Sequence, residues 1–146
     1  MEITDIRTDL RYDPKELYWI DVQGKIARIG MSPLVQESTG SFVAVQFAEA
    51  GKALIPGASF GSTEAEKHVG QLKSPLSGVL LRCNPQVREN PRLINTDPYG
   101  AGWLAEIELT NAGAELPQLI QGEAAVRAFF ESEIKKYQDK GWLAES

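Results

Sequence analysis

The chain has very little sulfur and no long apolar run. It contains a single cysteine, Cys83, which excludes an intrachain disulfide, and a single histidine, His68, so a site built from several His and Cys ligands is excluded too. No apolar segment approaches the ~20 residues of a membrane-spanning helix, and residues 1–5 have neither the basic start nor the apolar run of a signal peptide. We therefore expect a cytoplasmic protein without a metal site or a membrane partner.

The chain also lacks an excess of basic residues. Its net charge is −5, whereas the phosphates of nucleic acids require a basic face on the protein that binds them. No glycine-rich phosphate loop is present either. An acidic surface suits a protein that visits basic docking surfaces, but it is equally common for solubility alone. At this length the chain is predicted to form one domain, residues 1–146, with a core of its own.

Short strands are predicted through the first two thirds of the chain. Residues 18–22 and 26–29 flank a turn at Gly24, and 42–47 and 104–109 form further strands. Ser32, followed by proline, opens a short helix with its hydroxyl as the predicted cap, and Gly40 ends it. Residues 85–102 form a long polar connection that must pack to be ordered, and Trp103 is its predicted anchor.

Alternation along residues 79–83 predicts that Cys83 faces the core. Val79, Leu81 and Cys83 fall on one face of this strand, while Leu80 and Arg82 fall on the other. A buried thiol of this kind is inert, and a redox or sulfur-transfer role is the alternative.

The periodicity becomes helical after Pro117. An apolar stripe recurs at helical spacing and predicts a helix over about 121–140 whose stripe packs on the strands: Val126, Phe129, Phe130, Ile134 and Tyr137. Two i, i+4 ion pairs are predicted on its wet face, Glu123–Arg127 and Glu131–Lys135. Gly141 is the predicted stop, and the apolar pair at 142–143 is expected to fold back.

Lys67 is the candidate functional residue. The segments on both sides of it resemble strands, and Gly61, Gly70 and Gly78 supply a permissive backbone for a short hairpin. A lysine at such a tip projects into water, and nearby carboxylates keep its ammonium protonated, so its acylation requires a dedicated ligase. An ordinary solvated surface lysine is the alternative.

A series of other residues, in a fixed order along the chain, makes the identification of Lys67 as a functional residue more specific. The series comprises Trp19, Gly30, Gly40, Glu49, Gly51, Phe60-Gly61, Glu64 three residues before Lys67, Ser74-Pro75, Ser77-Gly78, Asn84, Pro91, Leu93-Ile94-Asn95, Asp97-Pro98-Tyr99-Gly100 and Gly102-Trp103-Leu104. From Arg11 to about Leu109 the chain resembles the glycine cleavage system H protein family, whose members are small lipoyl carriers.

The resemblance implies a mainly β fold, a flattened β barrel or hybrid barrel-sandwich over about 11–110, with the lipoyl-bearing hairpin, a short helix in its N-terminal half and a C-terminal helix. It implies that Lys67 carries lipoate in amide linkage and that Glu64 is recognised by the lipoate-attaching enzyme. Biotin is the rival cofactor, but biotin carriers usually flank their lysine with methionines, and the only methionines here are Met1 and Met31. Such a carrier catalyses nothing and acts as a monomer.

The residues beside the lysine depart from the family pattern. Glu66 stands where an apolar residue is usual, and His68 where a small one is usual. These changes favour a specialised branch, the lipoate-binding proteins of a heterodisulfide-reductase-like sulfur-oxidation complex, and predict weak coupling to glycine cleavage enzymes. The alternative is an ordinary glycine cleavage carrier of an aminomethyl group, with dihydrolipoamide dehydrogenase among its partners. A third possibility is an unmodified barrel that serves as a binding module.

Overall fold

The computed structural model describes residues 1–66 and 68–143. Two antiparallel sheets form the body, one of six strands in the order β1-β2-β3-β9-β8-β5 and one of three in the order β4-β6-β7. The strands are β1 (Arg11–Tyr12), β2 (Tyr18–Gln23), β3 (Ile26–Met31), β4 (Phe42–Phe47), β5 (Ala53–Leu54), β6 (Ser59–Ala65), β7 (Val69–Lys73), β8 (Gly78–Cys83) and β9 (Ala105–Leu109). The helices are η1 (Ile3–Asp5), α1 (Pro33–Thr39), α2 (Pro85–Glu89), α3 (Leu93–Thr96), α4 (Ala112–Glu115), η2 (Leu116–Gln118) and α5 (Glu123–Asp139).

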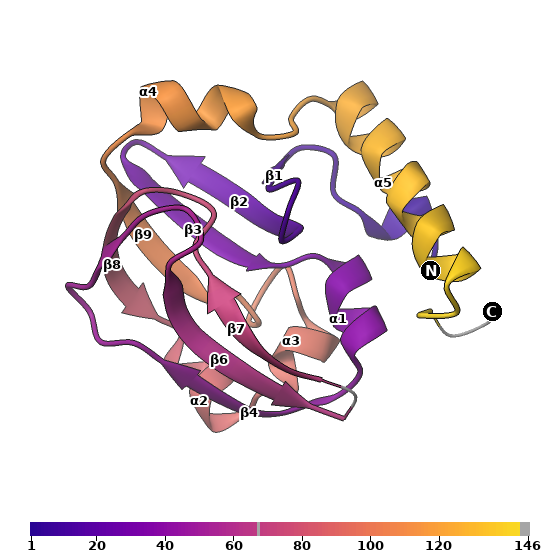
Figure 1. Cartoon of the computed structure of the whole chain (residues 1–146), viewed down its shortest axis with the longest axis horizontal. Helices are drawn as coiled ribbons and strands as arrows, with labels where there is room; N and C mark the ends of the chain where they lie inside the picture. Colours follow the sequence, from indigo (N-terminus) through magenta and orange to yellow (C-terminus); the bar gives the residue numbers. More distant parts are fainter. Residues whose placement is uncertain (67, 144–146) are drawn as a thin grey trace.

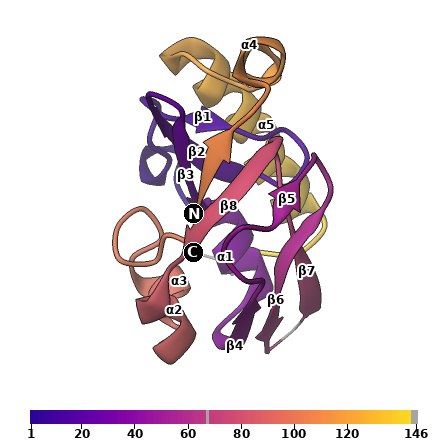
Figure 2. The same cartoon turned by 90° about the vertical axis from the view of Figure 1, so that its left-hand side faces the viewer.

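The two sheets face each other as an open, barrel-like sandwich (Figures 1 and 2). No strand pairing joins them within the described residues, so the barrel is not closed. The predicted mainly β architecture with a C-terminal helix is confirmed. The hairpin of β6 and β7 ends at the opposite end of the sandwich from α4 (Figures 1 and 2).

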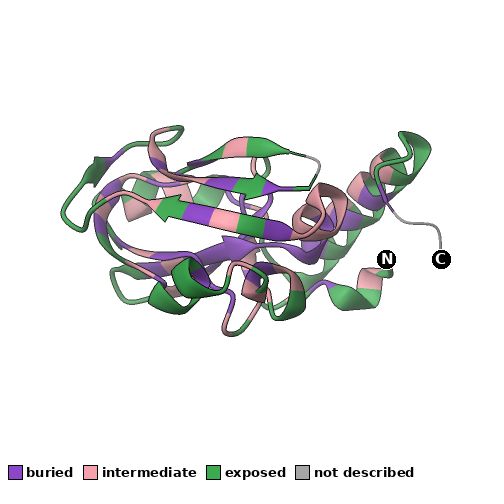
Figure 3. Cartoon of the chain, turned by 90° about the horizontal axis from the view of Figure 1, so that it is seen from below, coloured by how far each residue is buried: buried purple, intermediate pink, exposed green. Residues whose placement is uncertain are grey.

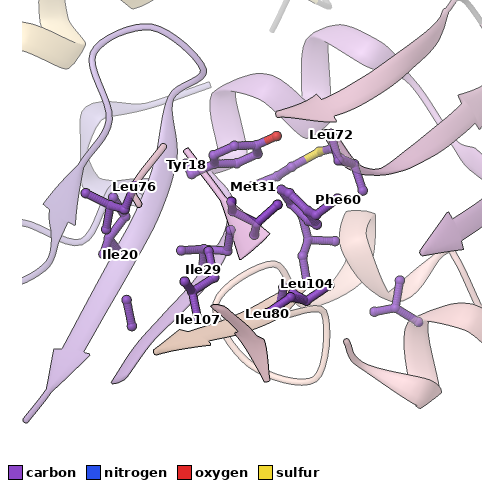
Figure 4. Packing of buried hydrophobic residues seen from close by; sticks show 14 of the residues in the cluster. Tyr18, Ile20, Ile29, Met31, Phe60, Leu72, Leu76, Leu80, Leu104 and Ile107 are labelled. Carbon is purple, nitrogen blue, oxygen red and sulfur yellow. The ribbon is translucent and has the colours of Figure 1, made fainter. Parts of the chain in front are cut away.

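The main core fills the space between the two sheets (Figure 4). Consecutive residues of a strand point to opposite faces, so Tyr18 and Ile20 of β2 enter this core while Trp19 between them points the other way. All three are nevertheless buried, because α5 and the N-terminal segment cover the second face of β2. Buried residues accordingly line the strands in the middle of the molecule, while the outer turns are exposed (Figure 3).

The C-terminal helix α5 is held by a second apolar cluster. Val126, Phe130 and Ile134 are buried, while Phe129 and Tyr137 are only partly buried against the same cluster. The ring of Phe130 meets that of Tyr12 edge-on, with centroids 4.7 Å apart. The predicted stripe is therefore confirmed, although the helix is shorter than predicted because Gly122, with a φ of 91°, starts it only at residue 123.

Two details of the helices correct the sequence predictions, and a third confirms one. The Ser32 hydroxyl is buried and makes no hydrogen bond to any described residue. The backbone carbonyl oxygen of Ser32 instead accepts from the backbone N–H groups of Val35 and Gln36. The ion pair of Glu123 with Arg127 is present at 3.8 Å. The predicted partner of Lys135, however, is wrong, since Lys135 contacts Asp139 at 3.2 Å.

Strand β8 contains a bulge that alters the predicted alternation. Its pairing with β9 shifts between Leu80 and Arg82, and Leu80, not Leu81, is the buried residue. A bulge inserts one extra residue and reverses the faces beyond it. Cys83 therefore still packs partly against the core, and burial raises the pKa of its thiol to about 11. Val79 and Leu81 do not share a buried face with it, so this part of the prediction is wrong.

The connection at 85–102 contains two helices that the sequence analysis missed, α2 and α3. Asn84 caps α2 by accepting from the N–H of Gln86, and its amide donates to the carbonyl oxygens of Ala101 and Trp103. Trp103 is buried, as predicted for the anchor of this connection, and the guanidinium of Arg28 lies 4.3 Å from its ring centre.

Candidate functional site

The candidate site is the turn between β6 and β7. Glu64 is paired with Val69, and beyond them the backbone N–H of Ala65 donates to the carbonyl oxygen of His68 at 2.8 Å. The His68 N–H returns a longer bond to the Ala65 oxygen at 3.5 Å. The chain thus reverses direction between Ala65 and His68, as the sequence predicts. Lys67 itself lies outside the described residues.

The glycines around this turn have a different role from the predicted one. Gly61, Gly70 and Gly78 lie in β6, β7 and β8, and none of them has a positive φ. At Gly61 an added Cβ would collide with the carbonyl oxygen of Gln46 on the neighbouring strand. These glycines therefore permit close approach of neighbouring atoms and are not needed for an unusual backbone conformation.

Glu64 lies on the outer face of the three-stranded sheet. Its neighbours Thr63 and Ala65 are buried, so alternation directs Glu64 away from the core, and it is exposed. Across the sheet it is flanked by Ala44 on β4 and by Val69 on β7, which is 72% exposed. This position is accessible to an approaching enzyme, as its predicted role in recognition requires.

Glu66 is bonded to the segment that joins α1 to β4. Its backbone N–H donates to the carbonyl oxygen of Ser41 at 3.1 Å, and its carboxylate accepts from the Ser41 N–H at 2.9 Å. Both backbone polar groups of Ser41 are therefore bonded to the same residue of the turn. Because the partners are 25 positions apart, no local sequence pattern predicts this contact.

His68 lies on the inner face of the hairpin. It is exposed, and its imidazole lies so close to Gly70 that a Cβ there would be 2.7 Å from Nε2. It also borders a cavity of about 120 Å³ between β7 and α1, together with Glu16, Tyr18, Val35, Thr39 and Leu72. The structure thus directs Glu66 and His68 to different neighbours, although the two residues flank the same lysine.

Asn95 of α3 supports the same region, a role that the sequence does not predict. Its side-chain oxygen accepts from the N–H of Phe42 at 2.9 Å, and its amide donates to the carbonyl oxygen of Gly40 at 2.8 Å and to Gln36 at 3.1 Å. The one available signal was its place in the Leu-Ile-Asn element of the family pattern, which carries no information about its partners.

Neither a metal site nor a membrane-spanning helix is found in the described part of the chain. No group of three or more His, Cys, Asp or Glu residues there is arranged to hold a metal ion. None of the helices described combines the length and the apolar character needed to cross a membrane.

An open sandwich of two antiparallel sheets, with exposed residues at the end of one hairpin, defines a small β domain that presents a turn to solvent. Comparisons with known proteins specify the class further. The family model for the glycine cleavage H-protein matches residues 10–132, and the chain therefore belongs to this family.

Relatives and a solved structure agree with this assignment. The chain is 39% identical over 115 residues to the glycine cleavage system H protein of Carboxydothermus hydrogenoformans, covering 79% of this chain and 87% of the relative. It is 41% identical to that of Myxococcus xanthus, covering 71% and 80%. The crystal structure of a glycine cleavage system H protein from Mycobacterium marinum superposes with a TM-score of 0.66 at 35% identity, covering 72% of this chain and 87% of that one.

Family membership settles the general role. The protein is a non-catalytic lipoyl carrier that acts with partner enzymes, and members of the family hold lipoate covalently on a lysine. These matches support the ordinary glycine cleavage carrier, which the sequence analysis gave as the alternative, better than the sulfur-oxidation branch that it favoured.

Proposed function

We propose that Lys67 is the lipoylated residue and that its arm carries an aminomethyl group between glycine cleavage enzymes. The observation that supports this most is the position of the turn. The residues on both sides of position 67, Glu66 and His68, are exposed at the end of a hairpin. An enzyme can reach this segment without unfolding the sheet.

The residues around the turn fit an attached lipoyl group. Glu64, exposed three residues before the lysine, is the proposed recognition residue for the lipoate-attaching enzyme. When bound, lipoate supplies a dithiolane that accepts and releases a group through its sulfurs. The tether keeps the reactive end at roughly millimolar effective concentration near a docked partner. The role of the chain is therefore to present the arm, and the chemistry belongs to its partners.

We further propose that the whole chain, residues 1–146, acts as one carrier domain. Val35 of α1 packs against both apolar clusters, and Tyr12 of β1 forms a β-bridge with Ile120, just before α5. The bridge connects the segment before α5 to the edge of the six-stranded sheet, and Val35 joins the main core to the apolar cluster that holds α5. This supports a single unit rather than a barrel with a detached helix.

The proposed partners are the lipoate-attaching enzyme and the glycine cleavage enzymes, including dihydrolipoamide dehydrogenase. A heterodisulfide-reductase-like complex is the second candidate, and the observation in its favour is the pair of polar residues, Glu66 and His68, beside the lysine.

Peptide mass spectrometry of protein incubated with lipoate, ATP and a lipoate ligase tests the site. We expect lipoate on Lys67, its loss in Lys67→Arg, and its retention in Lys73→Arg, a matched change at the exposed base of the same hairpin. Lipoate on another lysine, or on none, would contradict the assignment.

The cargo is tested by offering the lipoylated protein to a reconstituted glycine cleavage system. We expect turnover close to that of an ordinary H protein. Little or no turnover by fully lipoylated protein would instead favour the sulfur-oxidation candidate.

A further inference from the structure

Glu66 connects the hairpin turn to the junction between α1 and β4. Figure 1 shows that β4 starts beside the end of the β6–β7 hairpin. Phe42 of β4 pairs with Ala65 of β6, and the bond from the Glu66 N–H to the Ser41 oxygen extends this ladder by one step. In a regular antiparallel pair the Ser41 N–H would donate to the backbone carbonyl oxygen of its partner. Here it donates to the side-chain carboxylate of Glu66 instead.

The junction is fixed from its other side by Asn95. The three consecutive residues 40, 41 and 42 are bonded alternately: Gly40 and Phe42 to Asn95, and Ser41 to Glu66. Asn95 is itself held in α3, where the adjacent Ile94 is fully buried in the main core. A core-anchored helix therefore holds residues 40 and 42, and residue 41 between them is bonded to Glu66, the residue that precedes Lys67.

We propose that Glu66 is a positioning residue, whose bonds to Ser41 hold the turn in one orientation for the enzymes that act on Lys67. The proposal rests on the assignment of Lys67 as the modified lysine. A bond between a carboxylate and a backbone N–H is charge-assisted and stronger than a neutral one. It restricts the turn before an enzyme binds, so less conformational freedom is lost in the productive complex.

Substitutions at position 66 separate the hydrogen bond from the other properties of the side chain. Glutamine keeps an oxygen that can accept from the Ser41 N–H, but valine has no acceptor. Glu64→Gln is the matched control for the exchange experiment alone, because it removes the same charge two residues earlier on the outer face of the hairpin.

Amide hydrogen exchange followed by NMR tests the contact directly. In Glu66→Val we expect the Ser41 N–H to exchange at least about tenfold faster, while the core amides of Ile29 and Ile107 keep their protection. Glu66→Gln should retain most of the protection, and Glu64→Gln should retain all of it. Equal Ser41 exchange in wild type and Glu66→Val would overturn the proposal.

Ligation kinetics test the consequence. With a lipoate ligase, Glu66→Val should raise the KM for the protein about five- to tenfold with a smaller change in kcat. Glu66→Gln should have a KM much closer to that of the wild type. Equal KM values for wild type and Glu66→Val would overturn the positioning role even if Ser41 exchange differs. Absence of lipoate from Lys67 in every variant, wild type included, would instead refute the proposed function, and the exchange experiment would still decide whether the contact exists.

Discussion

Replacement of Phe130 by alanine tests how strongly α5 is attached to the sandwich. Phe130 is fully buried, and its ring packs edge-on against Tyr12 at 4.7 Å and against Phe129 at 5.3 Å. Truncation of a buried phenylalanine costs about 3–5 kcal/mol in unfolding free energy. The loss of two aromatic pairs places Phe130→Ala in the upper part of that range, since each is worth about 0.5–1.5 kcal/mol beyond the area that it buries.

The neighbouring Phe129 is the matched control. It carries the same side chain on the same helix but is only partly buried, so Phe129→Ala should cost about 1–2 kcal/mol. Urea denaturation monitored by circular dichroism and by tryptophan fluorescence measures both variants. In a chain of this size, 3–5 kcal/mol lowers Tm by roughly 6–20 °C. A Phe130→Ala variant within about 0.5 kcal/mol of wild type, or no difference between the two variants, would refute the packing of α5 described here.

Three further predictions concern the sandwich. Partial burial disfavours ionisation of Glu106, but hydrogen bonds from two arginines outweigh this effect and hold the pKa of Glu106 below the ordinary 4.5. The ionised carboxylate therefore stabilises the fold above pH 4.5, and this stabilisation is lost as the pH falls through the lowered pKa. Glu106→Gln should therefore cost about 1 kcal/mol at pH 7 and progressively less below pH 4.5, as urea titrations across pH would measure. Cys83, with a pKa of about 11, should react with iodoacetamide at pH 8 at least about tenfold more slowly in the folded than in the urea-unfolded protein, and equal rates would contradict its burial. Gly30→Ala places a Cβ 2.5 Å from the ring of Trp19, whose Nε1 is held by a hydrogen bond, and should cost about 1–3 kcal/mol in the same denaturation assay with a shifted fluorescence maximum.

Elements with a local signal could be predicted from the sequence. The β2–β3 hairpin follows from Gly24, whose φ of 62° suits the turn, and α5 follows from a stripe that repeats over several turns. Helices α2 and α3 were missed because segments of five and four residues are too short to display a helical period. The bulge in β8 could not be predicted, since it depends on the pairing with β9 and leaves the sequence of the strand unremarkable.

The candidate site likewise combines features that the local sequence predicts with features that depend on contacts between distant segments. The position of the turn follows from the two strand-like segments that flank Lys67. The contact of Glu66 with Ser41 and the bonds of Asn95 join segments 25 and more than 50 residues apart, and only the folded sandwich brings them together. Nothing in the composition of either segment specifies these partners.

This contact also changes what the carboxylate at position 66 implies about the partners. Weak coupling to glycine cleavage enzymes would follow if a partner had to bury the Glu66 carboxylate unpaired, at a cost of several kcal/mol. In the structure the carboxylate already accepts a hydrogen bond from the Ser41 N–H within its own chain. A partner that covers the turn would therefore bury a carboxylate with part of its hydrogen bonding satisfied, and the penalty is smaller. An acidic residue beside Lys67 is thus compatible with the ordinary family role, and its presence alone does not require a different cargo.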